Sequence, residues 1–137
     1  MDRKILISGL ILALLSVVMG AFGAHALKAL VSIDNLALFE TGIRYQFLHA
    51  FALILLSFYG AHLEGKVTSV KAISWSANFF KSGILLFSGS LYLLTFRQFL
   101  PVQLIQFIGP ITPLGGLCFI LGWGSWLRLV IIHKVDK

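Results

Sequence analysis

The sequence predicts an all-α, polytopic membrane protein built as a bundle of four transmembrane helices. First, 58% of its 137 residues are apolar and only 12% are charged, whereas a soluble domain is typically about 45–50% apolar and about 25% charged. Second, the mean hydropathy is +0.95. Third, the apolar residues form four runs, each reaching the roughly 20 residues that cross a hydrocarbon layer. These observations exclude a disordered tail, a disulfide scaffold and an ordinary water-soluble enzyme.

The four predicted spans cover residues 5–27, 43–63, 77–97 and 104–130, and we expect them to form a single domain. Each run must be a helix, because backbone polar groups inside a lipid layer need partners within their own segment. The alternation of apolar and polar residues that is typical of a membrane barrel is absent from all four. No low-complexity stretch or linker indicates a second domain.

The first span begins like a signal peptide. Arg3 and Lys4 precede a long apolar run, and the small-residue motif Ala24-His25-Ala26 follows it. The apolar run is about 18 residues long, which exceeds the usual signal-peptide core of about 7–15 residues. We therefore expect this segment to be retained as the first transmembrane helix.

Small residues form a stripe along one face of the first span and of the fourth. They recur every three or four residues, which is the spacing at which two helices pack closely. Membrane helices gain little hydrophobic energy from touching each other, so such stripes predict tight helix packing. The predicted packing residues are Gly9, Ala13, Ser16, Gly20 and Gly23 in the first span, and Gly115, Cys118, Gly122 and Ser125 in the fourth. The chain has no second cysteine, which excludes an internal disulfide.

The connection between the first two spans predicts a short amphipathic helix. Asp34 is placed to cap a helix that begins at Asn35, and Glu40 and Arg44 follow at a spacing of four residues. The segment also carries several large apolar residues. We expect this helix to lie on the outer face of the membrane and to run into the second span.

The second span has two different faces. Its bulky face is expected to point toward lipid and carries Phe47, Phe51, Ile54 and Phe58. The opposite face is smaller and more polar, and it is expected to point into the bundle; it carries Tyr45, His49, Ala52, Leu56 and Gly60.

Polar side chains line one face of the third span. Lys81 lies near the inner end, where a lysine can extend its charge to water. Ser88, Tyr92 and Thr95 lie deeper and should therefore point inward. Hydroxyl groups between membrane helices commonly stabilise helix contacts without further function.

The fourth span is interrupted by two prolines. Pro110 and Pro113 cannot both lie in a regular helix interior, because each removes an N–H and crowds the preceding turn. We expect the outer third of this span to be kinked or unwound. Backbone groups freed in this way must lie against protein or a water-filled cavity.

The basic residues predict the orientation in the membrane. The chain has 11 Lys and Arg against 5 Asp and Glu, which gives a net charge of +6. Most of the basic residues lie on the side that would hold both termini, so we expect cytoplasmic termini. That side holds Arg3, Lys4, Lys66, Lys71, Arg128, Lys134 and Lys137, with Lys81 as the eighth when it extends to water, whereas the other side holds Lys28, Arg44 and Arg97. Trp75, Trp123 and Trp126 are then predicted to lie near the inner interface.

The basic residues form no continuous stripe, so they do not indicate a nucleic-acid partner. They are scattered at the ends of the apolar runs. Topology signals and contacts with anionic lipids explain this distribution. We expect the lipid bilayer itself to be the main partner.

When depth is counted along the helices, most of the polar side chains are predicted to lie in the outer half of the membrane. Counted inward from Arg44 and Arg97, His49 and Tyr92 each lie about 7 Å deep at about 1.5 Å per residue. Ionisable side chains inside a membrane are costly and are therefore candidates for function. The candidate ligand-binding residues are His25, Arg44, Tyr45, Gln46, His49, Ser88, Tyr92, Thr95 and Thr112. On a straight helix His25 faces away from the small-residue stripe, so its place in this set depends on a bend near Gly23.

Four sequence blocks, one for each span, carry a family resemblance. They are Gly20-Ala-Phe-Gly-Ala-His-Ala26, Phe39-x-Thr-Gly-x-Arg-Tyr-Gln46 followed by His49, Phe87-Ser-Gly-Ser-Leu-Tyr92, and Thr112-Pro-Leu-Gly-Gly116. The chain resembles the bacterial family of small membrane proteins called domain of unknown function 423, which includes the eukaryotic transmembrane protein 256. The resemblance implies a four-span protein of the bacterial cytoplasmic membrane. It brings no established activity, substrate or catalytic residue.

Three functions remain open from the sequence. The first is a non-catalytic structural or interaction component that associates with itself or with other membrane proteins, as the two small-residue stripes indicate. The second is a protein that handles a small ligand, a lipid, or a proton or ion, with Arg44 holding an anion and His49 exchanging protons near neutral pH. The third is an enzyme, although no Ser-His-Asp set, paired carboxylates, HExxH motif or P-loop is present. We expect no catalytic residue, no metal site and no cofactor.

Overall fold

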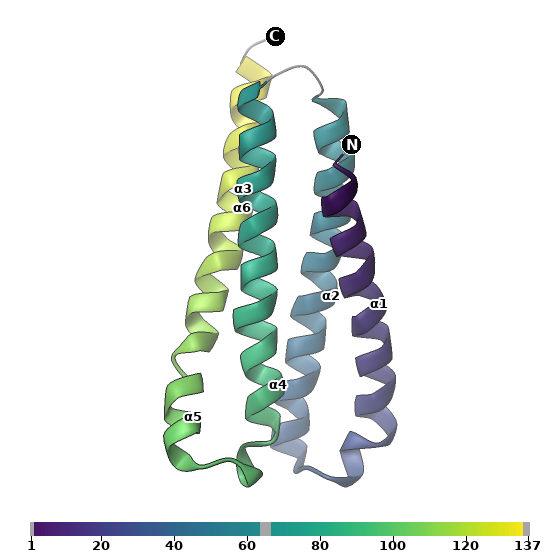
Figure 1. Cartoon of the computed structure of the whole chain (residues 1–137), viewed down its shortest axis with the longest axis vertical. Helices are drawn as coiled ribbons and strands as arrows, with labels where there is room; N and C mark the ends of the chain where they lie inside the picture. Colours follow the sequence, from purple (N-terminus) through teal and green to yellow (C-terminus); the bar gives the residue numbers. More distant parts are fainter. Residues whose placement is uncertain (1, 64–66, 136–137) are drawn as a thin grey trace.

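The computed structural model describes residues 2–63 and 67–135, which form helices joined by short connections (Figure 1). Four segments within these residues are long and apolar enough to cross a membrane, which confirms the predicted all-α architecture with four spans. Their bounds are Arg3–Ala29, Ile33–His62, Val70–Thr95 and Val102–Ile132, so the second and third spans begin earlier than the predicted residues 43 and 77. The helices are α1 (Arg3–His25), α2 (Ile33–His62), α3 (Val67–Gly83), α4 (Gly89–Thr95), α5 (Val102–Ile108) and α6 (Ile111–Val135). Short 3₁₀ segments, η1 (Leu27–Ala29) and η3 (Arg97–Phe99), lie in the connections, and a π-helical turn, η2 (Ile84–Ser88), joins α3 to α4.

Side chains at the helix starts explain where α1 and α2 begin. The Asp2 carboxylate accepts hydrogen bonds from the backbone N–H groups of Lys4 and Ile5, and the Ser32 hydroxyl accepts one from Asn35. The residue that caps α2 is therefore Ser32 and not, as the sequence predicted, Asp34. These side chains satisfy N–H groups that have no partner inside the helix.

The helix predicted in the first connection is continuous with the second span. α2 runs without a break from Ile33 to His62. Its first turns bury Asn35 and Phe39, and the ring of Phe39 packs at Gly23 of α1. This part of α2 thus stands against α1 rather than lying flat on the membrane surface.

The helices form two antiparallel pairs that lie side by side (Figure 1). α1 packs on α2, and α6 packs on α3 and η2, while α2 contacts α3, η2 and α4. The inner helices are accordingly more buried: in the most apolar stretch of each span, 44% of the α2 residues and 39% of the α3–α4 residues are buried, against 17% for the first and fourth spans. Leu53, Leu56 and Phe80 are fully buried, and they belong to one hydrophobic cluster to which α1, α2, α3 and α6 all contribute.

The two ends of the bundle differ. α1 begins and α6 ends at one end, whereas η1, η3 and α5 lie at the other (Figure 1). We call the end with η1, η3 and α5 the outer end. There the side-chain amide of Gln98 donates to the Leu30 carbonyl at 3.1 Å and links the two connections.

Most of the predicted packing glycines make the contacts expected of them. A Cβ at Gly9 would lie 3.0 Å from the Ala50 carbonyl oxygen, and one at Gly122 would lie 2.6 Å from the Phe80 ring. Gly20 is the exception, because nothing lies within 4 Å of the position that its Cβ would take. Ser16, Gly23 and Gly115 are buried, whereas Ala13, Cys118 and Ser125 are only half-buried.

The two faces of α2 are largely as predicted. Phe47, Phe51 and Phe58 are exposed toward the surroundings, which suits side chains that face lipid. Ile54 was assigned to this face wrongly, since it packs against Gly9 of α1. Tyr45 was assigned to the bundle face, but it lies at the edge of that face and is 38% exposed.

The fourth span is broken where its prolines predict. Gly109 and Pro110 separate α5 from α6, and Thr112 N–H donates to the Gly109 carbonyl at 3.3 Å. The π-helical turn η2 was not predicted. It faces the start of α6, where Gly115 lies against the backbone of Phe87, and such turns are frequent at functional sites.

Gly115→Ala should destabilise the protein. Its Cβ would lie 2.7 Å from both Cα and Cβ of Phe87, so the two helices must move apart. We expect a loss of about 1–3 kcal/mol in unfolding free energy, which is typical of overpacked cores, measured by unfolding in mixed micelles.

The matched control is Gly124→Ala in the same helix. Nothing lies within 4 Å of that Cβ position, so the control should keep or slightly raise the stability. Equal stability of the two variants would mean that the Gly115 contact is not tight.

Candidate functional site

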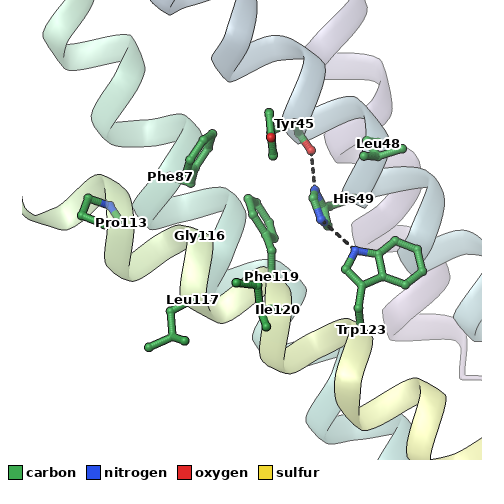
Figure 2. A pocket seen from close by; sticks show the side chains of 10 residues that line it. All are labelled: Tyr45, Leu48, His49, Phe87, Pro113, Gly116, Leu117, Phe119, Ile120 and Trp123. Atoms are coloured by element: carbon green, nitrogen blue, oxygen red, sulfur yellow. Dashed lines mark hydrogen bonds between the residues drawn. The ribbon is translucent and has the colours of Figure 1, made fainter.

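The candidate site is centred on His49, a buried histidine about halfway along α2. Its Nδ1 lies 2.8 Å from the Tyr45 carbonyl oxygen. A carbonyl can only accept, so Nδ1 carries the proton. The indole N–H of Trp123 in α6 donates to His49 Nε2 at 3.2 Å (Figure 2). The imidazole is therefore neutral, and both of its nitrogens are used within the protein.

Aromatic rings surround the imidazole. The ring of Phe119 stacks on it with a centroid distance of 3.5 Å and an interplanar angle of 10°. Phe80 packs beside it at 5.5 Å, and Tyr45 at 6.0 Å. Gly83 of α3 makes room for this arrangement, because a Cβ there would collide with the Phe119 ring.

A groove between α2 and α6 opens beside this histidine. We call it the α2–α6 groove; its volume is about 750 Å³, within the roughly 300–1,000 Å³ that is usual for small-ligand sites. The His49, Phe119 and Trp123 side chains point into the space between the two helices (Figure 2). The residues that line the groove are Tyr45, Leu48, His49, Phe87, Pro113, Gly116, Leu117, Phe119, Ile120 and Trp123. Its surface is therefore mostly hydrocarbon and aromatic.

A second polar bridge joins α1, α2 and α4. The Tyr92 hydroxyl donates to Gln46 Oε1 at 2.9 Å, and Gln46 Nε2 donates to the Leu12 carbonyl at 3.0 Å. Gln46 is buried, so both ends of its amide are paired away from lipid. Gly42 accommodates the Tyr92 ring, because a Cβ there would lie 2.7 Å from it.

A third polar bridge joins α4 to α6. Ser90 donates its hydroxyl to the Phe87 carbonyl at 2.9 Å, so the 2.7 Å contact between the Ser90 and Thr112 hydroxyls has Thr112 as its donor. Phe87 lies within η2, so the π-helical turn and the start of α6 meet at this bridge. The three bridges together connect all four spans.

The predicted site residues are not gathered in one cavity. Tyr45 lies beside His49, Gln46 pairs with Tyr92, and Thr112 pairs with Ser90. The Thr95 hydroxyl donates to the Leu91 carbonyl in its own helix, and the buried Ser88 hydroxyl has no partner. His25 and Arg44 are exposed and take no part in these bridges.

The sequence placed His49 in the outer half of the membrane and Trp123 near the inner interface, and the structure shows that these two expectations cannot both hold. α2 already begins at Ile33, so His49 lies roughly 24 Å along the helix at about 1.5 Å per residue, close to its middle. Trp123 was placed near the inner interface, but it reaches the same level as His49. The site thus lies near the middle of the bundle and not close to its outer end.

Sequence reasoning missed Phe119, Trp123 and Ser90. Phe119 and Trp123 lie four residues apart, which places them on one helix face, and this spacing was the available signal. Nothing in the sequence connects that face with His49. Within residues 2–63 and 67–135, no three His, Cys, Asp or Glu side chains lie together in a way that could hold a metal ion.

Comparison with known proteins identifies the family. Residues 19–116 match the family model described as a protein of unknown function, DUF423. The chain belongs to this family. That assignment confirms the resemblance of the four sequence blocks, all of which lie within the matched range; Phe119 and Trp123 lie outside it.

Relatives of this DUF423 protein are named as membrane proteins. The UPF0382 membrane protein YwdK of Bacillus subtilis is 42% identical over 129 residues, covering 94% of each chain. The UPF0382 membrane protein SAB0533 of Staphylococcus aureus is 36% identical, covering 88% of this chain and 89% of the relative. A UPF0382 membrane protein of Haemophilus influenzae is 37% identical, covering 80% and 78%. No solved structure matches the chain.

The hydrogen bond between Trp123 and His49 should stabilise the bundle measurably. We expect Trp123→Phe and His49→Phe to show a coupling energy of about 0.6 kcal/mol, with an upper bound of about 1.7 kcal/mol, in a double-mutant cycle of unfolding free energies. Trp75→Phe, at an exposed tryptophan of α3, serves as the control and should show no coupling to His49→Phe. A coupling of zero for Trp123 would contradict the bridge.

Proposed function

We propose that this protein is a non-catalytic component of the bacterial cytoplasmic membrane that binds an apolar chain, such as that of a lipid, in the α2–α6 groove. The observation that supports this proposal is that both imidazole nitrogens of His49 already have hydrogen-bond partners within the protein. Both of its nitrogens and the Trp123 N–H are paired with each other or with the backbone. The groove therefore offers its occupant a surface of rings and hydrocarbon, which favours an acyl or isoprenoid chain over a polar substrate.

The same pairing supports a non-catalytic role. A general base needs a free lone pair within reach of the proton that it removes, and His49 Nε2 is already accepting from Trp123. Proton transfer through His49 would require this bond to break first. The geometry thus favours binding over the proton-handling function that the sequence left open.

A lateral opening suits a ligand that is dissolved in the membrane. The groove lies between two helices that are each long and apolar enough to cross a membrane, so its open side faces the bilayer plane. Leu48, Leu117 and Ile120, which line it, are all exposed by 50% or more. A lipid chain can enter without crossing water.

The charge distribution supports cytoplasmic termini. Arg3, Lys4, Lys71 and Arg128 lie toward the end where α1 begins and α6 ends. Lys66 and Lys137, which the sequence-based prediction also counts, lie outside the described residues. An excess of basic residues on one side is typical of the cytoplasmic side, so we propose that the outer end faces away from the cytoplasm.

Gly116→Leu should abolish lipid retention. Gly116 lines the groove, and a Cβ there would meet only the Phe87 ring at an ordinary 3.9 Å, so the leucine fits and its side chain takes up space inside the groove. We expect native mass spectrometry of the protein purified in mild detergent to show a bound lipid for the unaltered chain and none for Gly116→Leu.

Gly124→Leu is the matched control for this experiment. It adds the same side chain to α6 at a position with nothing within 4 Å and away from the groove. Lipid retained by both variants, or by neither, would contradict the assignment of the groove as the binding site.

A second function, an interaction component, is favoured by one further observation. Gly20 of α1 has nothing within 4 Å of its Cβ position, and it lies on a helix whose outer surface is apolar. Small residues on such a surface let another membrane helix approach closely. A second copy of this chain is the simplest partner.

Crosslinking in mild detergent tests this second function. We expect a dimer band for the unaltered protein and a loss of at least half of it for Gly20→Leu, because the larger side chain keeps a second helix away. Gly89→Leu, at another glycine with open space around its Cβ position, should keep the dimer. A strictly monomeric protein would contradict the interaction function.

A further inference from the structure

We infer that the α2–α6 groove selects a phospholipid with an anionic headgroup, whose phosphate binds Arg44 while one acyl chain occupies the groove. This inference rests on the proposed function and adds the chemistry of the ligand to it. The observation behind it is the position of an exposed cation at the outer rim of the groove.

Arg44 lies next to the groove along α2. It directly precedes Tyr45 and lies four residues before Leu48, and both of these residues line the groove. Residues four apart occupy the same side of a helix, so Arg44 stands one turn outward from Leu48. Tyr45 and Leu48 mark this wall of the groove in Figure 2.

An exposed cation at this position needs an anion or water. Arg44 lies well inside α2, which continues outward to Ile33, and a cation within a membrane span is costly unless it is paired or reaches the interface. Glu40, which is also exposed, lies one turn farther outward. Arg44 therefore lies on α2 between Glu40 and Leu48, and its side chain is exposed rather than packed inside the protein.

With the bilayer midplane at the level of His49, the extended side chain of Arg44 reaches toward the level of a lipid phosphate. A hydrocarbon layer about 30 Å thick places the headgroups about 15 Å from its midplane. Arg44 lies five residues outward from His49, which is about 7–8 Å at about 1.5 Å per residue. His49 lies near the middle of α2, so the extended guanidinium covers most of the remaining distance. An acyl chain that starts at this phosphate then runs inward past Leu48 to Trp123.

Arginine also suits the chemistry of the headgroup. Its planar guanidinium binds phosphate oxygens through two parallel hydrogen bonds. Around this outer rim the basic residues Lys28, Arg44 and Arg97 outnumber the acidic residues Asp34 and Glu40, so the local charge also favours an anionic headgroup. A zwitterionic lipid offers the same phosphate together with a cation that Arg44 would repel, so the net charge of the headgroup distinguishes the two.

Fluorescence of Trp123 reports on the occupant directly, since its indole lines the groove. The experiment uses the full chain carrying Trp75→Phe and Trp126→Phe, so that Trp123 is the remaining tryptophan. It is reconstituted in nanodiscs of phosphatidylcholine. Lipids brominated in the middle of an acyl chain, with either a phosphatidylglycerol or a phosphatidylcholine headgroup, are titrated separately over the same range of mole fractions. Bromine quenches the indole on contact.

We expect brominated phosphatidylglycerol to reach half-maximal quenching at about a fivefold lower mole fraction than brominated phosphatidylcholine, as one basic residue near an anionic headgroup should give. Arg44→Gln should remove this preference. Arg97→Gln should keep it, because Arg97 is likewise an exposed arginine toward the outer end but lies in η3, outside the groove.

The outcomes separate the inference from the function on which it rests. Equal quenching by the two lipids that Gly116→Leu suppresses would overturn the anionic selectivity and leave the lipid-binding groove in place. Quenching that Gly116→Leu does not change would overturn both. A preference for phosphatidylglycerol that survives Arg44→Gln but is lost in Arg97→Gln would overturn the assignment of the phosphate to Arg44.

Discussion

Helices in a lipid layer are not driven together by the hydrophobic effect, so the bundle depends on close packing and on polar groups that find their partners inside the protein. In this chain the two requirements are met by the same few contacts. The bridges centred on Gln46, His49 and Ser90 each join different helices. Each bridge also has a glycine nearby that lets the backbones or rings approach, as Gly42 does for Tyr92 and Gly83 does for Phe119. Most of the polar side chains that the sequence predicted to bind a ligand instead form hydrogen bonds between the spans.

That arrangement also determines where a ligand can bind. α2 contacts α1 on one side and α3, η2 and α4 on the other, while α6 packs on α3 and η2. The space between α2 and α6 is bridged at the level of His49 by one hydrogen bond and one ring stack. On the surface side of this bridge the groove stays open. The groove is apolar toward a ligand, because the nitrogens of His49 and Trp123 already form hydrogen bonds within the protein.

The sequence was sufficient for the spans but not for the site. Hydropathy and length placed the four helices, and Pro110 and Pro113 placed the break, because these features act within one segment. The packing of Gly9 and Gly122 followed from small-residue spacing for the same reason. The contact between His49 and Trp123 joins residues 74 positions apart, and no pattern within a single helix encodes which face meets which. Because α2 begins at Ile33, His49 lies close to the middle of this helix rather than near its start. The π-helical turn η2 could not be predicted, because it lies in an apolar run without a glycine or proline inside it.

The neutral imidazole has one more consequence. Trp123 N–H donates to it across the space between α2 and α6, which also meet here through the stacked rings of His49 and Phe119. Any change in the separation of α2 and α6 must therefore lengthen or shorten this bond. The proton resonance of the indole nitrogen, which is sensitive to hydrogen-bond length, is thus a built-in measure of how far apart the two halves of the molecule stand. It can be read without attaching a label anywhere in the chain.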